Sequence, residues 1–474
     1  MPERPLCFVL MPFGKKPDPA GGPGIDFDAI YDRGLQPGIG DAGMSPIRAD
    51  EEKLGGVIHT QMFERLLLCD FAVADLTTEN PNVLYELGIR HAARPRTTLT
   101  VYAARKPLPF DVKPLRTQPY ELTDGNELTP EAAERLRRAV TDHLTTLREL
   151  ARRQDVTDSP LFQSIPAWRP APLAAEAAST FQEQVQASEA LKRRLERVRR
   201  MAGSSGTAAK ARADLAEIHG TVRAGDSADL GVHTGLMLAY RALNDWSGMI
   251  STYAEMPTAL QRQVEVRQLL AFAHNRLAED VDRPDREEER RTALDLLNQI
   301  EDEQGPSSET YGLRGRVYKS HWLELFDAGD EYRAPLLLER AVNEYVRGFE
   351  TDWRDYYPGV NAVTLLDVQG TADSLAKKDE LLPVVRFALE QRAQTESADY
   401  WVAATRLELA VLDNDPAAAT RALGEALLNR PEAWQGTTTA DNLSIIRQAR
   451  AGRGADVTWL DGLITALSPP GPQQ

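Results

Sequence analysis

The stretch that decides the fold is residues 69–92, with the sequence CDFAVADLTTENPNVLYELGIRHA. Its apolar run from Phe71 to Ala74 predicts a buried strand that ends at Asp75. The Asn-Pro pair at 80–81 is a typical helix start, because Asn caps the first turn and Pro suits the first helical position. The predicted helix carries Glu86 one to two turns in. Since ligands bind outside the carboxyl ends of parallel strands, we expect both carboxylates to face one pocket.

The whole chain has the composition of a soluble globular protein, with 42% hydrophobic and 27% charged residues in 474 positions. Length alone suggests about three domains. The net charge of −16 argues against general nucleic-acid binding, because phosphate contacts need a basic surface. Cys7 and Cys69 lie in apolar runs, which fits a reducing compartment. The sequence shows neither a membrane-spanning window nor a signal-peptide pattern. We therefore expect a cytoplasmic protein with no membrane partner.

Strand-like and helix-like stretches alternate over residues 1–150. Two more strands are expected near 7–11 and 98–102, and a long helix is expected at 131–152. Residues 15–24 are rich in Gly, Pro and Lys, so they predict a mobile loop. The alternation predicts a parallel sheet covered by helices, that is, a flavodoxin/Rossmann-like α/β domain.

The second half of the chain is predicted to be helical. Four prolines predict an extended linker at 151–175, packed through Leu161, Phe162, Ile165 and Trp168. Residues 176–468 then form an all-α domain, and a disordered tail is expected at 469–474. Partial tetratricopeptide patterns occur there, with small and aromatic residues at repeat positions: Tyr311, Gly315, Tyr318, Ala419, Ala426 and Pro431. Such residues let paired helices approach closely, so the pattern predicts a tetratricopeptide-like solenoid.

The segments Ala74-Asp75-Leu76 and Asn80-Pro81-Asn82-x-x-Tyr85-Glu86-Leu87-Gly88 carry a resemblance. Residues 6–122 resemble the nucleoside 2-deoxyribosyltransferase-like superfamily, with Toll/interleukin-receptor-like (TIR-like) domains that cleave NAD as relatives in architecture. In the transferases, the Glu of the Tyr-Glu-Leu-Gly segment attacks the anomeric carbon and forms a glycosyl–enzyme intermediate. The resemblance therefore implies Glu86 as the nucleophile and Asp75 as the group that positions or protonates the leaving base.

This pairing suits the chemistry, because breaking an N-glycosidic bond builds positive charge at C1′ and the leaving base needs a proton. The resemblance also implies Gly14, Asn82 and Tyr85 as ligand-binding residues, with NAD, a nucleotide or a nucleoside as substrate or ligand. No cofactor is expected, and the histidines lack the spacing of a metal site.

Two alternatives to this interpretation stay open. Glu86 and Arg90 are four residues apart on one helix face, so they also predict an ordinary ion pair worth a few tenths of a kcal/mol. The second alternative is a non-catalytic scaffold whose α/β domain only senses a ligand or mediates assembly. The sequence thus leaves open whether the protein is an enzyme, namely a retaining N-glycosidase, an NAD hydrolase or a deoxyribosyltransferase.

A second resemblance rests on three segments: Asp158 to Phe162, Glu309 to Lys319, and Tyr356 to Ala362. Residues 156–440 resemble the TRAF-binding region of the apoptosis signal-regulating kinases and its prokaryotic relatives, a tetratricopeptide-like scaffold for protein partners. Pro358-Gly359 predicts a turn between helices, and Asn361 predicts the cap of the next helix. The resemblance implies a signalling or defence protein with a protein partner on its helical repeats, and a homo-oligomer is compatible with it.

Overall fold

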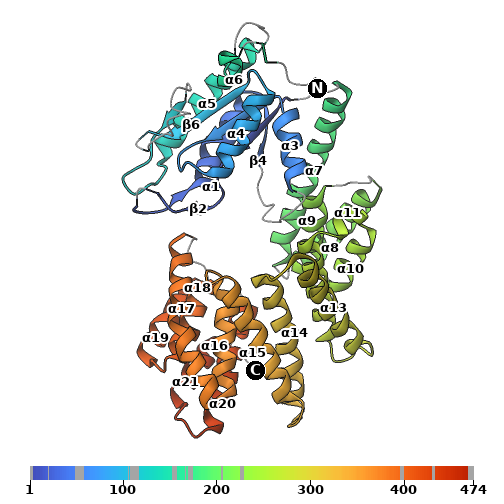
Figure 1. The fold of residues 1–474 in the computed structure, drawn as a ribbon, viewed down its shortest axis with the longest axis vertical. Coiled ribbons are helices and arrows are strands. Elements are labelled where there is room, and N and C mark those ends of the chain that lie inside the picture. The colour runs from blue at the N-terminus through green and yellow to red at the C-terminus, as the bar shows by residue number, and fades with distance from the viewer. Residues whose placement is uncertain are drawn as a thin grey trace. The chain divides into compact units, whose positions relative to one another are not determined.

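The computed structural model describes residues 4–19, 21–48, 58–104, 106, 117–151, 157–165, 167–168, 175–203, 206–224, 229–395, 400–429 and 433–467. The chain divides into two compact units (Figure 1). The first comprises Met1–Met201 and Ala213–Gly235, and the second comprises Ala202–Arg212 and Leu236–Gln474. The domain limits expected at residues 150 and 175 stay predictions. Pro431 and the tail 469–474 lie outside the described residues.

The first unit is built on a five-stranded, fully parallel sheet. Its strand order is β4 (Ser45–Arg48), β1 (Leu6–Leu10), β5 (Phe71–Asp75), β6 (Thr98–Ala103) and β7 (Gln118–Tyr120). The predicted parallel sheet is therefore confirmed. The stretch expected as a mobile loop is partly ordered, since β2 (Lys15–Lys16) pairs antiparallel with β3 (Ile25–Asp26).

Helices cover both faces of this sheet (Figure 1). One face packs Val9 and Val73 against α1 (Phe27–Ile30), η1 (Tyr31–Leu35), α2 (Gln36–Asp41) and α5 (Pro130–Leu150). The other face packs Phe8 and Ala74 against α3 (Ile58–Leu68) and α4 (Pro81–Ala93). Successive residues of a strand point to opposite faces of the sheet. The cluster to which a strand residue belongs therefore shows which face of the sheet its side chain lies on.

The Pro-rich stretch is attached to the first unit where the structure describes it. Asp158 Oδ2 accepts hydrogen bonds from the backbone N–H groups of Thr97 and Thr98, at 2.6 and 3.1 Å. The short helix α6 (Pro160–Ser164) follows. Leu161 and Phe162 are half-buried on α6, which contacts α4, and the Trp168 indole N–H donates to the carbonyl oxygen of Ala92 at 2.8 Å. Ile165 is 50% exposed.

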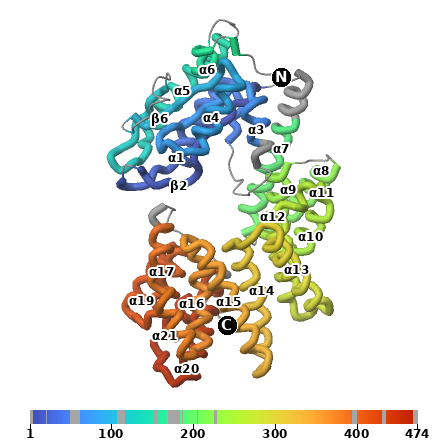
Figure 2. Tube along the Cα trace, viewed as in Figure 1, coloured from blue at the N-terminus to red at the C-terminus, as the bar shows by residue number. Residues whose placement is uncertain are grey.

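The second unit consists of helices that pack as successive pairs (Figure 2). Helices α8 (Ala208–Ala224) and α9 (Leu230–Ala242) belong to both units, and α7 (Ala175–Ala202) belongs to the first up to Met201. The pairs are α12 (Val264–Ala278) with α13 (Arg286–Gln304), α14 (Ser308–Asp327) with α15 (Ala334–Thr351), α16 (Tyr356–Gln369) with α17 (Ala372–Thr395), α18 (Tyr400–Leu412) with α19 (Pro416–Leu428), and α20 (Ala433–Gly452) with α21 (Thr458–Leu467). Helices α10 (Trp246–Glu255) and α11 (Thr258–Gln261) precede α12. The mostly helical second half is confirmed.

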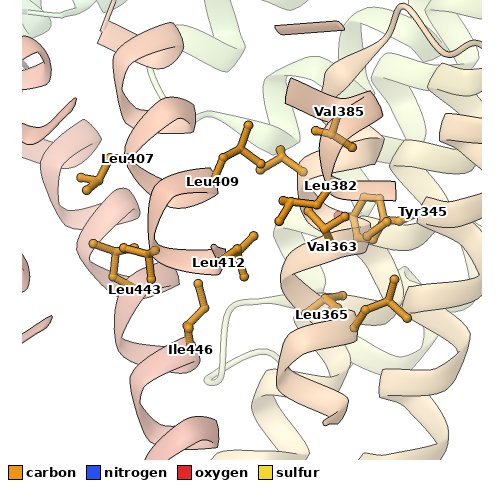
Figure 3. Close-up of a cluster of buried hydrophobic side chains, with 14 of the residues drawn as sticks. Tyr345, Val363, Leu365, Leu382, Val385, Leu407, Leu409, Leu412, Leu443 and Ile446 are labelled. Carbon is orange, nitrogen blue, oxygen red and sulfur yellow. The ribbon is translucent and has the colours of Figure 1, made fainter. Parts of the chain in front are cut away.

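One hydrophobic cluster joins helices α14 to α21, and Figure 3 shows its part on α15 to α18 and α20. It contains Tyr345 on α15, Val363 on α16, Leu382 on α17, Leu409 on α18 and Leu443 on α20. The first helices of these pairs also contact one another, namely α14 with α16, α16 with α18 and α20, and α18 with α20. The second unit therefore has a continuous core, as stacked helical pairs require.

The predicted turn at Pro358-Gly359 is wrong, because both residues lie inside α16. Asp355 is the N-cap, and its carboxylate accepts from the N–H of Tyr357 at 3.2 Å. Pro358 therefore falls in the first turn, where a missing N–H costs no intrahelical bond. Asn361 is not a cap, because it lies one turn further into the helix.

Gly315 and Gly312 on α14 give a matched pair of substitutions. A Cβ at Gly315 would lie 2.9 to 3.0 Å from the buried Tyr345 ring, whereas a Cβ at Gly312 would find ordinary contacts of 3.5 Å or more. We predict that Gly315→Ala lowers the free energy of unfolding by about 1–2 kcal/mol, because overpacking outweighs the gain in helix propensity. Gly312→Ala should be neutral or stabilising, and urea unfolding of both variants measures the difference. Equal effects would contradict the tight α14–α15 contact.

Candidate functional site

The candidate site of the first unit is the carboxyl edge of the sheet, near the junction of β1 and β5. The chain leaves β1 toward β4 on one side and later adds β5 on the other, which makes this junction the topological switch point. Phe13 and Gly14 follow β1, Arg48 ends β4, and Asp75 ends β5. The sequence predicts Gly14 and Asp75 at this edge but does not indicate Arg48, because the short strand β4 carries little strand signal.

Arg48 and Asp28 fill the β1–β4 side of this edge. The Arg48 guanidinium lies 4.7 Å from the centroids of both the Phe13 and the Tyr31 rings and forms an ion pair with Asp28. The backbone N–H of Gly14 donates to Asp28 Oδ1 at 3.0 Å. Gly14 has a positive φ of 64°, and a Cβ there would meet no atom within 4 Å. Its amide is therefore already engaged by a carboxylate.

Asp75 is buried at the end of β5 with both of its carboxylate oxygens engaged. Oδ1 accepts from the backbone N–H of Thr77 at 2.9 Å and from its hydroxyl at 2.5 Å, and Oδ2 accepts from the Tyr120 hydroxyl at 2.9 Å. Burial raises the pKa of Asp75 to about 6, against the hydrogen bonds from Thr77 and Tyr120, which lower it. This arrangement ties β5 to β7 and leaves little capacity for a ligand.

Glu86 is half-buried on α4, and burial raises its pKa to about 7. Among the residues that the structure describes, none forms a hydrogen bond or ion pair with its carboxylate. The helix starts as predicted, because Asn80 Oδ1 accepts from the N–H groups of Asn82 and Val83 at 2.9 and 3.4 Å. A half-buried carboxyl group without a partner is a candidate for chemistry or binding.

The predicted Glu86–Arg90 ion pair is wrong. The Arg90 side chain is fully buried and turned toward the segment between α3 and β5. Its guanidinium donates to the carbonyl oxygens of Leu66 and Cys69, both at 2.8 Å, and of Asp70 at 3.2 Å. Arg90 therefore fixes α4 on the sheet, and Glu86 keeps no cationic neighbour on its own helix.

The structure does not bring Asp75 and Glu86 together. Asp75 follows Phe71 and Val73 onto the face covered by α5, where its partner Tyr120 also lies. Glu86 lies on α4, which covers the opposite face. Asn82 and Tyr85 are exposed on α4, Tyr85 by 60%. Asp75 and its partner Tyr120 thus lie on one face of the sheet, and Glu86, Asn82 and Tyr85 lie on the helix that covers the other face.

A hollow of about 480 Å³ lies elsewhere, at the carboxyl ends of β6 and β7. Asp18 lies at this hollow, ion-paired with Lys106 and accepting from Asn126 Nδ2 at 3.0 Å. No pattern in the sequence indicated this hollow.

Within the described ranges, no cluster of three or more His, Cys, Asp or Glu side chains has the geometry to hold a metal ion. Over the same ranges, no helix is long and apolar enough to cross a membrane.

The second unit carries a polar cluster between the first helices of its pairs. Lys319 Nζ on α14 donates to Asn361 Oδ1 on α16 at 3.0 Å and to Asn442 Oδ1 on α20 at 3.3 Å. Glu408 on α18 accepts from the Thr364 hydroxyl at 2.5 Å and from Asn442 Nδ2 at 3.4 Å. The segments that carried the second resemblance therefore meet in space, since Lys319 and Asn361 are directly bonded.

These features define a class of protein in which a parallel α/β unit is joined to a unit of stacked helical pairs. The chain belongs to the MAP3K TRAFs-binding domain family, whose sequence model matches residues 83–459. The match begins inside α4 and ends inside α21, so it spans parts of both units. This bears out the resemblance to the TRAF-binding region.

A curated relative supports the same relationship. The chain is 27% identical over 227 residues to the mitogen-activated protein kinase kinase kinase nsy-1 of Caenorhabditis elegans. The aligned part is 46% of this chain and 15% of that protein. The family model leaves residues 1–82 unmatched, and the resemblance of residues 6–122 to the deoxyribosyltransferases and TIR-like domains is not confirmed.

The raised pKa of Glu86 predicts a pH-dependent effect of Glu86→Gln on stability. The folded state keeps the Glu86 proton up to a pKa of about 7, whereas the unfolded chain loses it near 4.5, so wild-type stability falls as the pH rises through this window. The Glu86→Gln variant has no carboxyl group at this position, so its stability does not fall in this way as the pH rises. We expect it to gain on the wild type from pH 4.5 to 7, reaching about 2 kcal/mol above pH 7.

Thermal unfolding of both proteins between pH 4.5 and 8 measures this gain. Glu64→Gln, at an exposed glutamate on α3, is the matched control for removal of a glutamate charge. A Glu86→Gln difference that follows this control at every pH would show that burial of the Glu86 carboxyl group has no energetic consequence.

Proposed function

We propose that the protein is a signalling scaffold whose helical unit binds protein partners of the TRAF class. The observation that carries this proposal is the family match over residues 83–459, because the family is described as the TRAFs-binding domain of MAP3Ks. The likeness to a MAP3K supports a role in signalling. We place the protein in the cytoplasm on the same grounds.

The architecture supports a scaffold of this kind. We propose that the helical pairs are tetratricopeptide-like repeats, because consecutive pairs stack and their first helices contact one another. Repeats of this type build extended binding surfaces from many short elements. The strand order β4-β1-β5-β6-β7 supports a flavodoxin-like α/β unit. We assign to that unit a role in assembly, including formation of a homo-oligomer.

Direct binding tests this function. The full chain, immobilised on a biosensor, should bind a purified TRAF protein saturably with a dissociation constant at or below the micromolar range, as is usual for specific protein partners. Glu86→Gln should leave this binding unchanged, because Glu86 lies in the other unit. Failure of every TRAF protein tried to bind saturably up to about 100 µM would refute the proposal.

A second candidate function concerns the first unit, and one observation favours it. Glu86 is a half-buried carboxyl group with a pKa near 7 and no partner among the described residues. A group that titrates near neutral pH can hold or release a proton in the working range. We propose Glu86 as the residue through which the α/β unit binds, and cleaves, an N-glycoside such as NAD, a nucleotide or a nucleoside.

In this candidate reaction, the ionised Glu86 carboxylate bonds to C1′ as the bond to the base breaks; nicotinamide leaves NAD as a neutral molecule, whereas a nucleoside base takes a proton from solvent water. A second water then bonds to C1′, the bond from Glu86 to C1′ breaks, and the proton of that water passes to the solvent. Asp75 contributes support rather than a proton, because both of its oxygens are engaged by Thr77 and Tyr120. The remaining candidates, Gly14, Asn82 and Tyr85, would act only as ligand contacts. The role of each residue follows from the resemblance and from this geometry together.

Chromatography of NAD and deoxynucleosides incubated with the full chain tests this reaction, with and without a TRAF protein present. Release of free base should rise with pH through about 7, as Glu86 ionises, and Glu86→Gln should lower the rate at least 100-fold. Glu64→Gln should keep the full rate. Absence of base release from the wild type under every condition, or an unchanged rate in Glu86→Gln, would leave the α/β unit as a non-catalytic sensor or assembly module.

A further inference from the structure

The hollow in the α/β unit is formed by three segments that are far apart in the sequence. One segment connects β2 to β3, one follows β6 and one follows β7, and they contribute Asp18, Lys106 and Asn126 to its wall. Ligands of parallel sheets bind at the carboxyl ends of the strands, where this hollow lies. Its volume of about 480 Å³ is in the range of small-molecule sites. The hollow therefore has the position and the size of a ligand site.

A buried carboxylate holds the three segments together. The Asp18 side chain is only 3% exposed and forms an ion pair with Lys106. Its Oδ2 also accepts from Asn126 Nδ2 at 3.0 Å, and the same amide nitrogen donates to the carbonyl oxygen of Pro23 at 2.6 Å. A buried network whose members are paired in this way is rigid. The wall of the hollow is thus fixed before any ligand arrives.

Asn126 presents an acceptor that no described group uses. The residue is 7% exposed, and its backbone has a φ of 59°, a left-handed conformation that asparagine tolerates better than most residues. Because Nδ2 faces the two acceptors on Asp18 and Pro23, the orientation of the amide is settled and Oδ1 is the remaining acceptor. Among the described residues, none donates to this oxygen.

Two further side chains supply donors. Lys106 Nζ carries three hydrogens, and Asp18 is its one described partner. The Thr123 hydroxyl oxygen accepts from the backbone N–H of Glu127 at 3.1 Å, which leaves its hydrogen for a ligand. The wall therefore offers one neutral acceptor and two donors.

The charges around the hollow indicate a neutral ligand. Asp18 is paired with Lys106, and Glu121 is paired with Arg135 at 2.5 Å. Asp124, the third carboxylate of the wall, also has an interaction partner. Three carboxylates against one ammonium disfavour a phosphate, and their pairing leaves no bare carboxylate to attract a cation.

We propose that this hollow binds a neutral ligand with neighbouring hydroxyl groups, namely a sugar ring. A hydroxyl group both donates and accepts, so such a ring can donate to Asn126 Oδ1 and accept from Thr123 and Lys106. A free monosaccharide and the ribose of a nucleoside share this chemistry. The site is independent of the functions proposed above, because it uses neither Glu86 nor the helical unit.

D-ribose is the probe, titrated into the full-length protein and followed by saturation-transfer difference NMR. We expect saturable binding with a dissociation constant on the order of 1 mM, as suits a ligand of about ten non-hydrogen atoms. Ala104→Met should weaken it at least tenfold, because it lengthens an exposed side chain of the wall without removing a side-chain hydrogen bond.

Ala190→Met, at an exposed alanine on α7, is the matched control and should bind as the wild type does. Equal affinities for Ala104→Met and Ala190→Met would overturn the proposal. So would the absence of saturation of the wild type by either D-ribose up to about 50 mM or adenosine up to about 5 mM.

A second variant keeps the test independent of any folding defect in Ala104→Met. Thr123→Val removes one donor from the wall and should weaken D-ribose binding about fivefold, with the melting temperature unchanged. Thr145→Val is its control, because it removes an exposed hydroxyl that also makes one local backbone bond, and it should have no effect on binding. Affinity equal in these two variants would contradict the assigned role of the wall.

Two other ligands identify the source of the sugar ring. Adenosine binding that is tighter than D-ribose binding and equally sensitive to Thr123→Val assigns the hollow to nucleosides, whereas D-ribose binding alone assigns it to free sugars. Preference for D-ribose 5-phosphate would overturn the proposal, because a phosphate needs an unpaired cation.

Glu86→Gln separates this site from the candidate reaction. D-ribose binding should be unchanged in that variant and unaffected by a TRAF protein. Loss of D-ribose binding in Glu86→Gln would place the sugar at Glu86 and refute the hollow as its site. Base release or TRAF binding that fails while D-ribose still binds through Thr123 refutes the corresponding function and leaves the hollow standing.

Discussion

The structure depends on one constraint, which is that a polar side chain buried between elements must be hydrogen-bonded. In the α/β unit, Arg90 meets this constraint by donating to three carbonyl oxygens at the end of α3, and it fixes α4 on the sheet. In the helical unit, Lys319 meets it through Asn361 and Asn442, and so joins α14, α16 and α20. Removing one partner from such a site leaves the other buried and unpaired, which costs more than the bond contributes.

Glu86, a half-buried side chain for which the described residues provide no hydrogen-bond partner, carries the proposed chemistry of the α/β unit. Glu86 is half-buried without a described partner because Arg90, its natural helical neighbour, is committed to the backbone beneath α4. A half-buried carboxylate without a described partner can accept hydrogen bonds from a ligand. The family match over residues 83–459 gives the protein-binding function of the helical unit the greater weight.

The sequence predicted those strands and helix starts that depend on a short run of neighbouring residues. The strand at Phe71–Asp75 and the helix start at Asn80-Pro81 occur where the sequence placed them. The edge strands β4 and β7 were missed, because each is short and contains a proline, Pro46 or Pro119. Proline is tolerated at a sheet edge but lowers the strand signal. Pro358-Gly359 was predicted as a turn but lies inside α16. A proline in the first turn of a helix gives the same sequence pattern as a proline in a turn, so the sequence did not separate the two.

The candidate site was less predictable, because it depends on which face of the sheet each side chain takes. Asp75 and Glu86 are eleven residues apart, and the spacing alone suggested one pocket. Strand alternation sends Asp75 toward Tyr120, a partner 45 residues away, whereas α4 covers the other face. The hollow at Asp18 forms only where three segments far apart in the sequence meet, so no sequence pattern indicated it.

Hydrogen–deuterium exchange of the full chain, with and without a saturating TRAF protein, tests the central claim most directly. The account predicts that the partner slows exchange in peptides from the helical unit and leaves exchange in α4 around Glu86 unchanged. Slower exchange confined to α4, or no change anywhere in the helical unit, would contradict it.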